Sequence, residues 1–179
     1  MKPTKWSGDD GFTALVSGKQ VKKSSELIEL YGSIDELNVF LGFASEAMCC
    51  NQNFSSLLKS IYQIQRNLFE LCSNLVSGKK FTLHPEKLKV LESEIDTLSE
   101  KLPVLRSFIL PGGGEQASRM HIARAICRRA ERVAFKLAET NDNAKVIGVY
   151  LNRLSDWLYV AARTAALITN SEEMLVSNK

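Results

Sequence analysis

Four arginines crowd the short segment HIARAICRRAER at residues 121–132. The segment holds one acid, Glu131, and no glycine or proline, and its recurring alanine, isoleucine and cysteine residues predict the interior of a helix. Each guanidinium presents a planar fork of N–H donors that matches two oxygen atoms of a carboxylate or a phosphate. The sequence therefore predicts an anion-binding helix that carries Arg124, Arg128, Arg129 and Arg132.

A helical wheel divides this segment into a buried face and a charged face beside it. The expected buried face consists of Met120, Ala123, Cys127, Ala130, Ala134 and Leu137. The neighbouring face, which we call the arginine stripe, consists of His121, Arg124, Arg128, Glu131 and Arg132. Arg129 points elsewhere, which indicates a structural role. Because the stripe flanks the core, its arginines need anions, and counting alone does not decide between a phosphorylated ligand and the carboxylates of Asp35, Glu131 and Asp156.

A second row of polar side chains is expected on the helix that follows, over about residues 142–169. We call it the polar stripe: Asn152, Asp156, Tyr159 and Arg163 share one face at a helical spacing. An amide, a carboxylate and a phenol on a packed helix suit recognition of a ribose or a base, and they equally suit hydrogen bonds between helices. Two polar rows on consecutive helices favour one shared site.

Two glycine-rich segments add further candidates for phosphate binding. The segment SFILPGGGEQ leads into the arginine helix, and its backbone can approach a ligand at an electropositive helix N-terminus, although no G-K-[ST] follows it as in a Walker A loop. Phe108 in this segment is interpreted, from its type alone, as a core anchor. The N-terminal SGDDGFTALVSGKQVKKSS is either a frayed tail or a loop that orders on a ligand, and it offers hydroxyls, free backbone N–H groups and paired lysines that suit a polyphosphate.

Helical periodicity runs through nearly the whole chain from Ser33 onward, with no competing strand pattern. A capping box from Ser33 to Glu36 predicts the first helix start, and Pro85 suits the first position of the third helix. The remaining helices are expected over about 54–76, after the glycines at 112–114, and over about 142–169. The connections are short, which favours antiparallel neighbours. We therefore expect an all-α fold: a single domain over 1–179, with a flexible N-terminal ligand-binding loop at 1–32 and a five-helix bundle at 33–170.

Composition excludes several classes of function. The chain of 179 residues is 45% hydrophobic and 24% charged, which is ordinary for a globular domain, and its net charge of +3 is too small to indicate nucleic acid. Its four cysteines have no C-x-x-C spacing, and the two histidines are isolated, so we expect reduced thiols in the cytoplasm and no metal held by protein ligands. No apolar run is long enough to span a membrane, although removal of a transit peptide stays open.

Four blocks of this sequence resemble one family in order and spacing. The blocks are SGDDGFTAL, YGSIDELNVFLG, FILPGGGEQASRMHIARAICRRAER and YLNRLSDWLYVAAR. Together they resemble the PduO-type ATP:cob(I)alamin adenosyltransferases over nearly the whole chain, and the RRAER and NRLSD blocks on successive helices are specific to that family. The resemblance implies a five-helix bundle that assembles as a homotrimer with its active sites between subunits.

The resemblance also implies a reaction. The 5′-deoxyadenosyl group of ATP moves to the cobalt of cob(I)alamin, which gives adenosylcobalamin and triphosphate, with Mg²⁺ bridging the phosphates. Because the nucleophile is the cobalt, no activated serine, cysteine or general base is expected. A flavin reductase that reduces cob(II)alamin and an enzyme that uses the product are implied partners.

Residue roles follow by position within the matching blocks. The implied ATP ligands are Lys5, Trp6, Ser7, Gly8, Thr13, Lys23, Arg128, Arg129, Ala130, Glu131, Arg132 and Asn152. Arg124 matches the catalytic arginine, paired across the subunit interface with Asp35. Phe108 matches the residue that blocks the lower face of the corrin and displaces its axial ligand, so that Co(II) is easier to reduce.

The chain departs from the family pattern in the ATP loop. The family usually has T-K-T-G-D-x-G where this chain has TKWSGDDG, and Leu27 stands where the family often has arginine. The sequence ends at EEMLVSNK, so we expect no corrin contact from a longer C-terminal tail. The altered loop favours the alternative of a non-catalytic ATP- or cobalamin-binding or delivery protein. A nucleic-acid binder is a third class, and the position of the stripe beside the core disfavours it.

Overall fold

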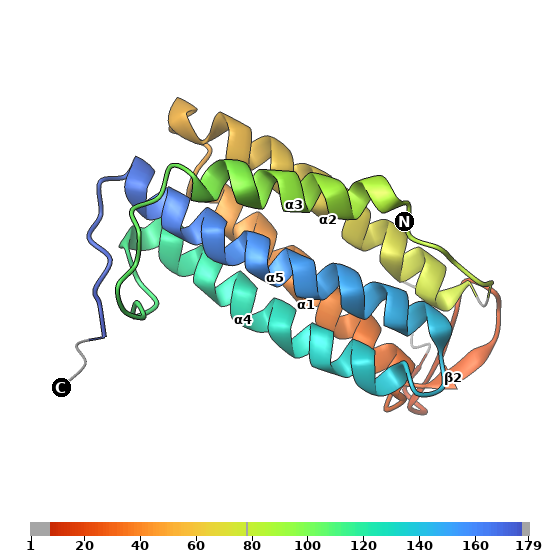
Figure 1. The fold of residues 1–179 in the computed structure, drawn as a ribbon. Helices are drawn as coiled ribbons and strands as arrows, with labels where there is room; N and C mark the ends of the chain where they lie inside the picture. Colours follow the sequence, from red (N-terminus) through yellow and green to blue (C-terminus); the bar gives the residue numbers. More distant parts are fainter. Residues whose placement is uncertain (1–7, 78, 177–179) are drawn as a thin grey trace.

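The computed structural model describes residues 8–77 and 79–176. Five α-helices run along a common bundle axis, and a short hairpin projects from one end (Figure 1). The elements are β1 (Phe12–Ala14), β2 (Gln20–Lys22), α1 (Glu26–Glu46), the 3₁₀ turn η1 (Gln52–Phe54), α2 (Ser55–Val76), α3 (Pro85–Ser99), α4 (Gly114–Leu137) and α5 (Asp142–Ile168). The predicted all-α class and the five-helix bundle are confirmed.

Two helices begin where local side-chain chemistry directs them to begin. Pro85 occupies the first turn of α3, and the Nδ1 atom of His84 accepts a hydrogen bond from the backbone N–H of Glu86 at 3.4 Å. At α5, the side-chain oxygen of Asn141 accepts from the N–H groups of Asn143 and Ala144 at 3.0 and 3.3 Å. Both starts match the sequence prediction.

The predicted start of α1 is wrong. Ser33 does not cap a helix, because it is buried within α1, which begins at Glu26 after the N-cap position Ser25. The side chain of Ser25 makes no capping hydrogen bond. Leu30 is fully buried and Leu27 packs against the core, so apolar burial extends the helix toward the N-terminus without a cap. The bundle therefore starts in the segment predicted to be a loop.

The N-terminal segment also contains a small hairpin that the sequence pattern did not reveal. Strands β1 and β2 pair antiparallel, with Thr13 opposite Val21. The turn between them closes with a hydrogen bond from the N–H of Gly18 to the carbonyl of Leu15 at 2.8 Å, and Gly18 has the positive φ of 81° that glycine adopts readily. Three-residue strands are too short to give a recognisable alternation.

Helices α4 and α5 form the closest-packed pair of the bundle. All six residues expected on the buried face of α4 are buried, and four of them are the small residues Ala123, Cys127, Ala130 and Ala134. The thiol of Cys127 donates to the carbonyl of Leu151 on α5 at 3.2 Å, so the two backbones lie close together. Polar residues at the edges of this contact therefore lie along one line between α4 and α5, which we call the seam.

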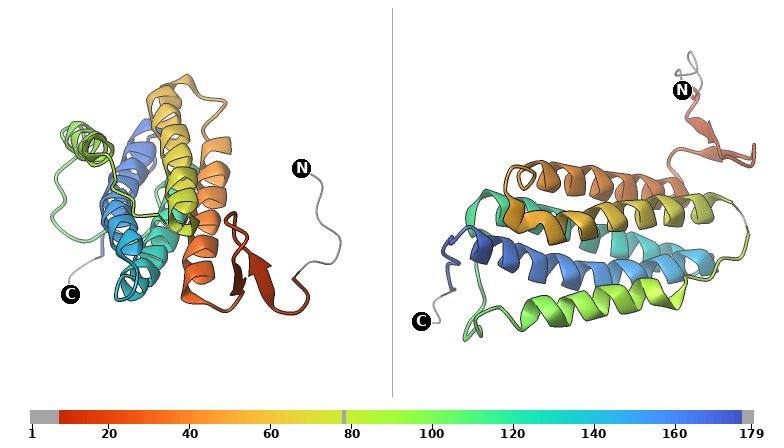
Figure 2. Two further views of the ribbon diagram at one scale, coloured as in Figure 1. Left: turned by 90° about the vertical axis from the view of Figure 1, so that its right-hand side faces the viewer. Right: turned by 90° about the horizontal axis from the view of Figure 1, so that it is seen from above.

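Helix α3 lies on the far side of α5 from α1 (Figure 2). Leu91 is the one residue of α3 that is buried. The carboxylate of Glu94 accepts hydrogen bonds from Trp157 Nε1 of α5 at 2.7 Å and from Ser60 Oγ of α2 at 2.8 Å. One carboxylate therefore links three helices. Among the described helices, none combines the length and the apolar character needed to cross a membrane.

Candidate active site

A hydrogen bond joins the RRAER and NRLSD blocks across the seam between α4 and α5. The Nδ2 atom of Asn152 donates to Oε1 of Glu131 at 2.9 Å. Two of the residues singled out from the sequence are therefore in direct contact, and the amide fixes the orientation of the carboxylate. The interpretation of the polar stripe as hydrogen bonds between helices is correct for Asn152.

The arginines beside this pair are not neutralised by carboxylates of the described chain. Arg128 and Arg132 are exposed, and Nη1 of Arg132 donates to the backbone carbonyl of Arg128 at 3.0 Å. In the described part of the chain, no ion pair involves Arg124, Arg128 or Arg132. Asp156, one of the expected partners, pairs with Arg153 at 3.6 Å instead. The carboxylates of the same chain therefore do not neutralise the stripe.

Arg129 behaves differently from the other arginines of the segment. Its guanidinium pairs with the carboxylate of Glu36 on α1, and this contact ties α4 to α1. The helical wheel correctly places Arg129 outside the stripe. The capping-box interpretation of Glu36 misses this structural role, because no local spacing relates residues so far apart in the sequence.

Arg124 and His121 lie at the middle of the seam beside Tyr159 of α5. The Arg124 Cζ atom lies 5.8 Å from the centroid of the Tyr159 ring, and the His121 ring lies 6.3 Å from the same centroid. Burial, and secondarily the charge of Arg124, lower the pKa of His121 to about 4, so its ring is neutral near pH 7.

Two nitrogen atoms at this point of the seam have no acceptor or donor in the described residues. Nε of Arg124 and Nδ1 of His121 are both buried and without a hydrogen-bond partner. Buried polar atoms are normally satisfied, so these two nitrogens are available to water or to another molecule. Asp35, the expected partner of Arg124, lies elsewhere, in a shallow pocket of α1 and α2 beside Phe69 and Cys72.

The N-terminal candidates are partly described. Lys5, Trp6 and Ser7 lie outside the described residues. Gly8 has a φ of 91°, and a Cβ atom there would lie 2.9 Å from Nζ of Lys23, so these two predicted ligands are in contact. Thr13 lines a pocket of about 270 Å³ together with Tyr31 and residues of the hairpin.

The hairpin and the arginine stripe lie on different sides of the chain. Both views in Figure 2 show the hairpin beside α1, on the side that faces away from α5. Gly8, Thr13 and Lys23 therefore do not meet Glu131 and Asn152 within one chain. Among the described residues, the predicted ATP ligands therefore form two separate surfaces.

Phe108 lies in the loop between α3 and α4, at the opposite end of the bundle from the hairpin (Figure 1). Its side chain is 83% exposed, so the interpretation as a core anchor is wrong. From this loop the seam passes Arg124 and then Arg128 before it reaches Arg132, and the separation of eight positions between Arg124 and Arg132 corresponds to about 12 Å of helix. Arg124, Arg128 and Arg132 are therefore arranged in order along one side of the bundle.

The described residues provide no ready metal cage. Within residues 8–77 and 79–176, no three side chains of the histidine, cysteine, aspartate or glutamate type are grouped so that they could hold a metal ion.

Comparison with known proteins identifies the family. The family model for cobalamin adenosyltransferase matches residues 4–165. The corrinoid adenosyltransferase of Bacillus subtilis (strain 168) is 41% identical over 160 residues, which cover 88% of this chain and 82% of that protein. The corrinoid adenosyltransferase PduO of Salmonella typhimurium is 39% identical over 163 residues, and the chain spans about half of its length, 47%.

A solved structure agrees with this assignment. A variant of the PduO-type ATP:corrinoid adenosyltransferase from Lactobacillus reuteri, complexed with cobalamin and ATP, has a TM-score of 0.89 and 30% identity, with 99% of this chain and 97% of that chain covered. The chain belongs to the cobalamin adenosyltransferase family, as the four sequence blocks predicted.

The low pKa of His121 predicts a specific dependence of stability on pH. The unfolded chain binds more protons than the folded chain between pH 6.5 and about 4, so the free energy of unfolding should fall as the pH drops through that range and level off below it. The loss has an upper limit of about 3 kcal/mol, reduced where solvent screens the ring. Urea unfolding of the wild type and of His121→Gln measures it, because the variant should lose this part of the slope.

The other histidine provides the matched control. His84 is exposed at the start of α3, and His84→Asn keeps a capping side chain, so this variant should keep the part of the slope that His121 contributes. An unchanged slope in His121→Gln would contradict the assignment of the low pKa to His121.

Proposed function

We propose that this chain transfers the 5′-deoxyadenosyl group of ATP to the cobalt of cob(I)alamin, giving adenosylcobalamin and triphosphate. The observation that carries the proposal is the seam where Asn152 holds Glu131 beside Arg128 and Arg132, whose charges have no carboxylate partner among the described residues. Membership of the family supports the activity, and the cobalamin and ATP bound by the Lactobacillus reuteri relative support the two substrates.

The transfer requires little covalent chemistry from the protein. Cobalt(I) donates an electron pair to C5′ of ATP, the bond between C5′ and its oxygen breaks, and triphosphate leaves with that bond's electrons. The protein must orient the two substrates and stabilise negative charge on the departing triphosphate. Arg128 and Arg132 suit the second task, because a guanidinium binds phosphate oxygens in pairs.

The nucleotide is held, in this proposal, by two groups of residues. The N-terminal segment contributes Lys5, Trp6, Ser7, Gly8, Thr13 and Lys23. The helices contribute Arg128, Arg129, Glu131, Arg132 and Asn152, whereas the predicted ligand Ala130 is fully buried in the bundle core and is left out. Arg129 is the weakest member, since its guanidinium pairs with Glu36. Mg²⁺ is carried by the phosphate oxygens and neutralises part of their charge.

A complete site then requires two copies of the chain, and we propose a homotrimer. The separation of the hairpin from the arginine stripe supports this, because the hairpin of one copy can reach the stripe of the next. The orphaned Nε of Arg124 supports a partner carboxylate, for which Asp35 of the partner subunit is the candidate. Asp35 is exposed, and Val39 and Phe69, near it on α1 and α2, are 64% and 65% exposed, as expected for a surface that another copy covers.

Phe108 is proposed to act on the second substrate. An aromatic ring that is 83% exposed at the start of the seam can lie beneath a corrin and exclude the lower axial ligand. Four-coordinate Co(II) accepts an electron more easily, so a flavin reductase can supply Co(I). In the cytoplasm, an enzyme that uses adenosylcobalamin would then take the product.

The activity has a direct test. Purified protein mixed anaerobically with ATP, Mg²⁺ and chemically reduced cob(I)alamin should give the absorption spectrum of adenosylcobalamin, together with one triphosphate for each product molecule. ATP binding without any spectral change under these conditions would contradict the transferase and favour the alternative of a binding or delivery protein.

Phe108→Ala separates reduction from transfer. We expect the variant to bind ATP normally and to alkylate pre-reduced cob(I)alamin at nearly the wild-type rate. With cob(II)alamin and a flavin reductase, its rate should fall by about 10-fold or more, because the lower axial ligand returns and reduction becomes unfavourable. Equal losses in the two assays would contradict the role given to Phe108.

A further inference from the structure

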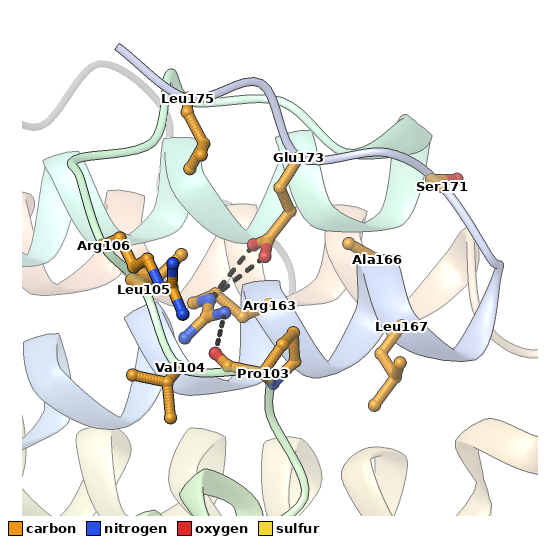
Figure 3. A pocket seen from close by; sticks show the side chains of 10 residues that line it. All are labelled: Pro103, Val104, Leu105, Arg106, Arg163, Ala166, Leu167, Ser171, Glu173 and Leu175. Atoms are coloured by element: carbon orange, nitrogen blue, oxygen red, sulfur yellow. Dashed lines mark hydrogen bonds and ion pairs between the residues drawn. The ribbon is translucent and has the colours of Figure 1, made fainter. Parts of the chain in front are cut away.

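A buried ion pair joins three segments at the end of the bundle where Phe108 lies. Arg163 of α5 is 7% exposed, and its Nε lies 3.2 Å from Oε2 of Glu173 in the segment after α5. Its Nη2 donates to the backbone carbonyl of Pro103 at 2.9 Å. Figure 3 shows the three residues meeting at the wall of a cavity of about 360 Å³. One guanidinium therefore connects α5, the α3–α4 loop and the segment after α5. We call this last segment, residues 169–176, the C-terminal strap.

The strap holds the backbone on both sides of Phe108. The N–H of Val176 donates to the carbonyl of Phe108 at 2.7 Å, and the N–H of Leu110 donates to the carbonyl of Met174 at 2.8 Å. Ile109 and Leu175 form an isolated antiparallel bridge between these bonds. Since the side chain of Phe108 is mostly exposed, packing does not orient it, and the backbone conformation that the strap imposes sets the direction of the ring.

The loop is also fixed where it enters α4. Gly113 and Gly114 both have a φ of 87°, which favours glycine. A Cβ atom at Gly113 would lie 2.8 Å from Cβ of Ala166, and one at Gly114 would lie 2.7 Å from Oγ of Ser171. The loop thus touches α5 or the strap at its start, around Phe108 and at its end.

We propose that Arg163 and Glu173 are positioning residues for Phe108. Their ion pair anchors the strap to α5, and the anchored strap presents the aromatic ring at a fixed height and angle to the corrin. Neither residue touches the reacting atoms. This inference rests on the role proposed above for Phe108, and it adds the part of the chain that gives the ring its position.

The chemistry of the pair suits this task. Removing one partner of a buried ion pair leaves the other charge without compensation, so the strap has one strongly preferred position. Glu173→Gln keeps the volume and an acceptor oxygen but removes the charge. Arg163→Lys keeps the charge but replaces the planar fork by a single ammonium, which cannot hold Glu173 and Pro103 in the same geometry.

The experiment compares two cobalt substrates. With pre-reduced cob(I)alamin and ATP, we expect Glu173→Gln and Arg163→Lys to keep kcat and the KM for ATP near the wild-type values. With cob(II)alamin and a flavin reductase, kcat should fall by about 10-fold, since a small misplacement of a positioned group has effects of this order. The electron paramagnetic resonance signal of four-coordinate Co(II) should shrink as it does in Phe108→Ala.

Glu172→Gln is the matched control. Glu172 precedes Glu173, is exposed, and makes no ion pair or side-chain hydrogen bond among the described residues. The control variant should behave as the wild type in both assays. Circular dichroism and urea unfolding of every variant show whether the bundle stays folded, and Glu173→Gln keeps the test decisive if Arg163→Lys fails to fold.

The possible outcomes separate the proposals. If Phe108→Ala behaves as the wild type, the role of Phe108 is wrong and the positioning role falls with it. If Phe108→Ala loses the cob(II)alamin reaction while Glu173→Gln keeps both reactions and the four-coordinate signal, only the positioning role is overturned. Equal losses with both cobalt substrates would show that the ion pair serves the fold and not Phe108.

Discussion

The close approach of α4 and α5 is the constraint on which the rest of the structure depends. Small residues along the buried face of α4 let its backbone lie against α5, with the Cys127 thiol bonded to the Leu151 carbonyl at 3.2 Å. At this separation, polar side chains on the rims of the two helices can reach each other, as Asn152 and Glu131 do. A bulkier residue at Ala130 would push α4 away from α5. The polar residues of α4 would then move away from those of α5 as well.

The arginines of α4 illustrate how one segment can divide its charge between folding and chemistry. Arg129 is neutralised by Glu36 and joins α4 to α1. Arg128 and Arg132 remain exposed beside the Glu131–Asn152 pair, and Arg124 keeps a buried Nε without a partner in the described chain. Fixed positive charge held next to a core, with no internal carboxylate to cancel it, is suited to a multiply charged leaving group. The net charge of +3 on the whole chain does not reveal this concentration of positive charge, because the positions of the charged residues matter more than their sum.

The sequence predicted those features that depend on helical periodicity. Helices α2 to α5, the buried face of α4 and the outward position of Arg129 all follow from spacing within one helix. The start of α1 was misplaced, because burial of Leu30 extended the helix beyond a local capping signal at Ser33. The family blocks identified the class of protein, but they did not predict which residues from distant parts of the chain contact each other.

The features that could not be predicted depend on contacts between distant segments. The strap is irregular, and the Arg163–Glu173 pair has no signature in either segment alone. The exposure of Phe108 follows from the way the strap holds its loop, whereas an aromatic residue is usually buried. Likewise, the helical wheel placed Arg124 on the stripe but could not show that Asp35 lies on another face of the same chain. Such relations become visible only when the three-dimensional arrangement is known.

Subunit complementation tests most directly whether the hairpin of one copy and the arginine stripe of another copy form each site. Lys23→Ala damages the first surface and Arg128→Ala damages the second, so each variant alone should lose most of its transferase activity. Co-expression with different affinity tags, followed by purification through both tags, yields mixed trimers, in which about a third of the interfaces combine an intact hairpin with an intact stripe. Recovery of activity to about a third of the wild-type rate is the predicted result. Mixed assemblies no more active than the single variants would contradict a site shared between subunits.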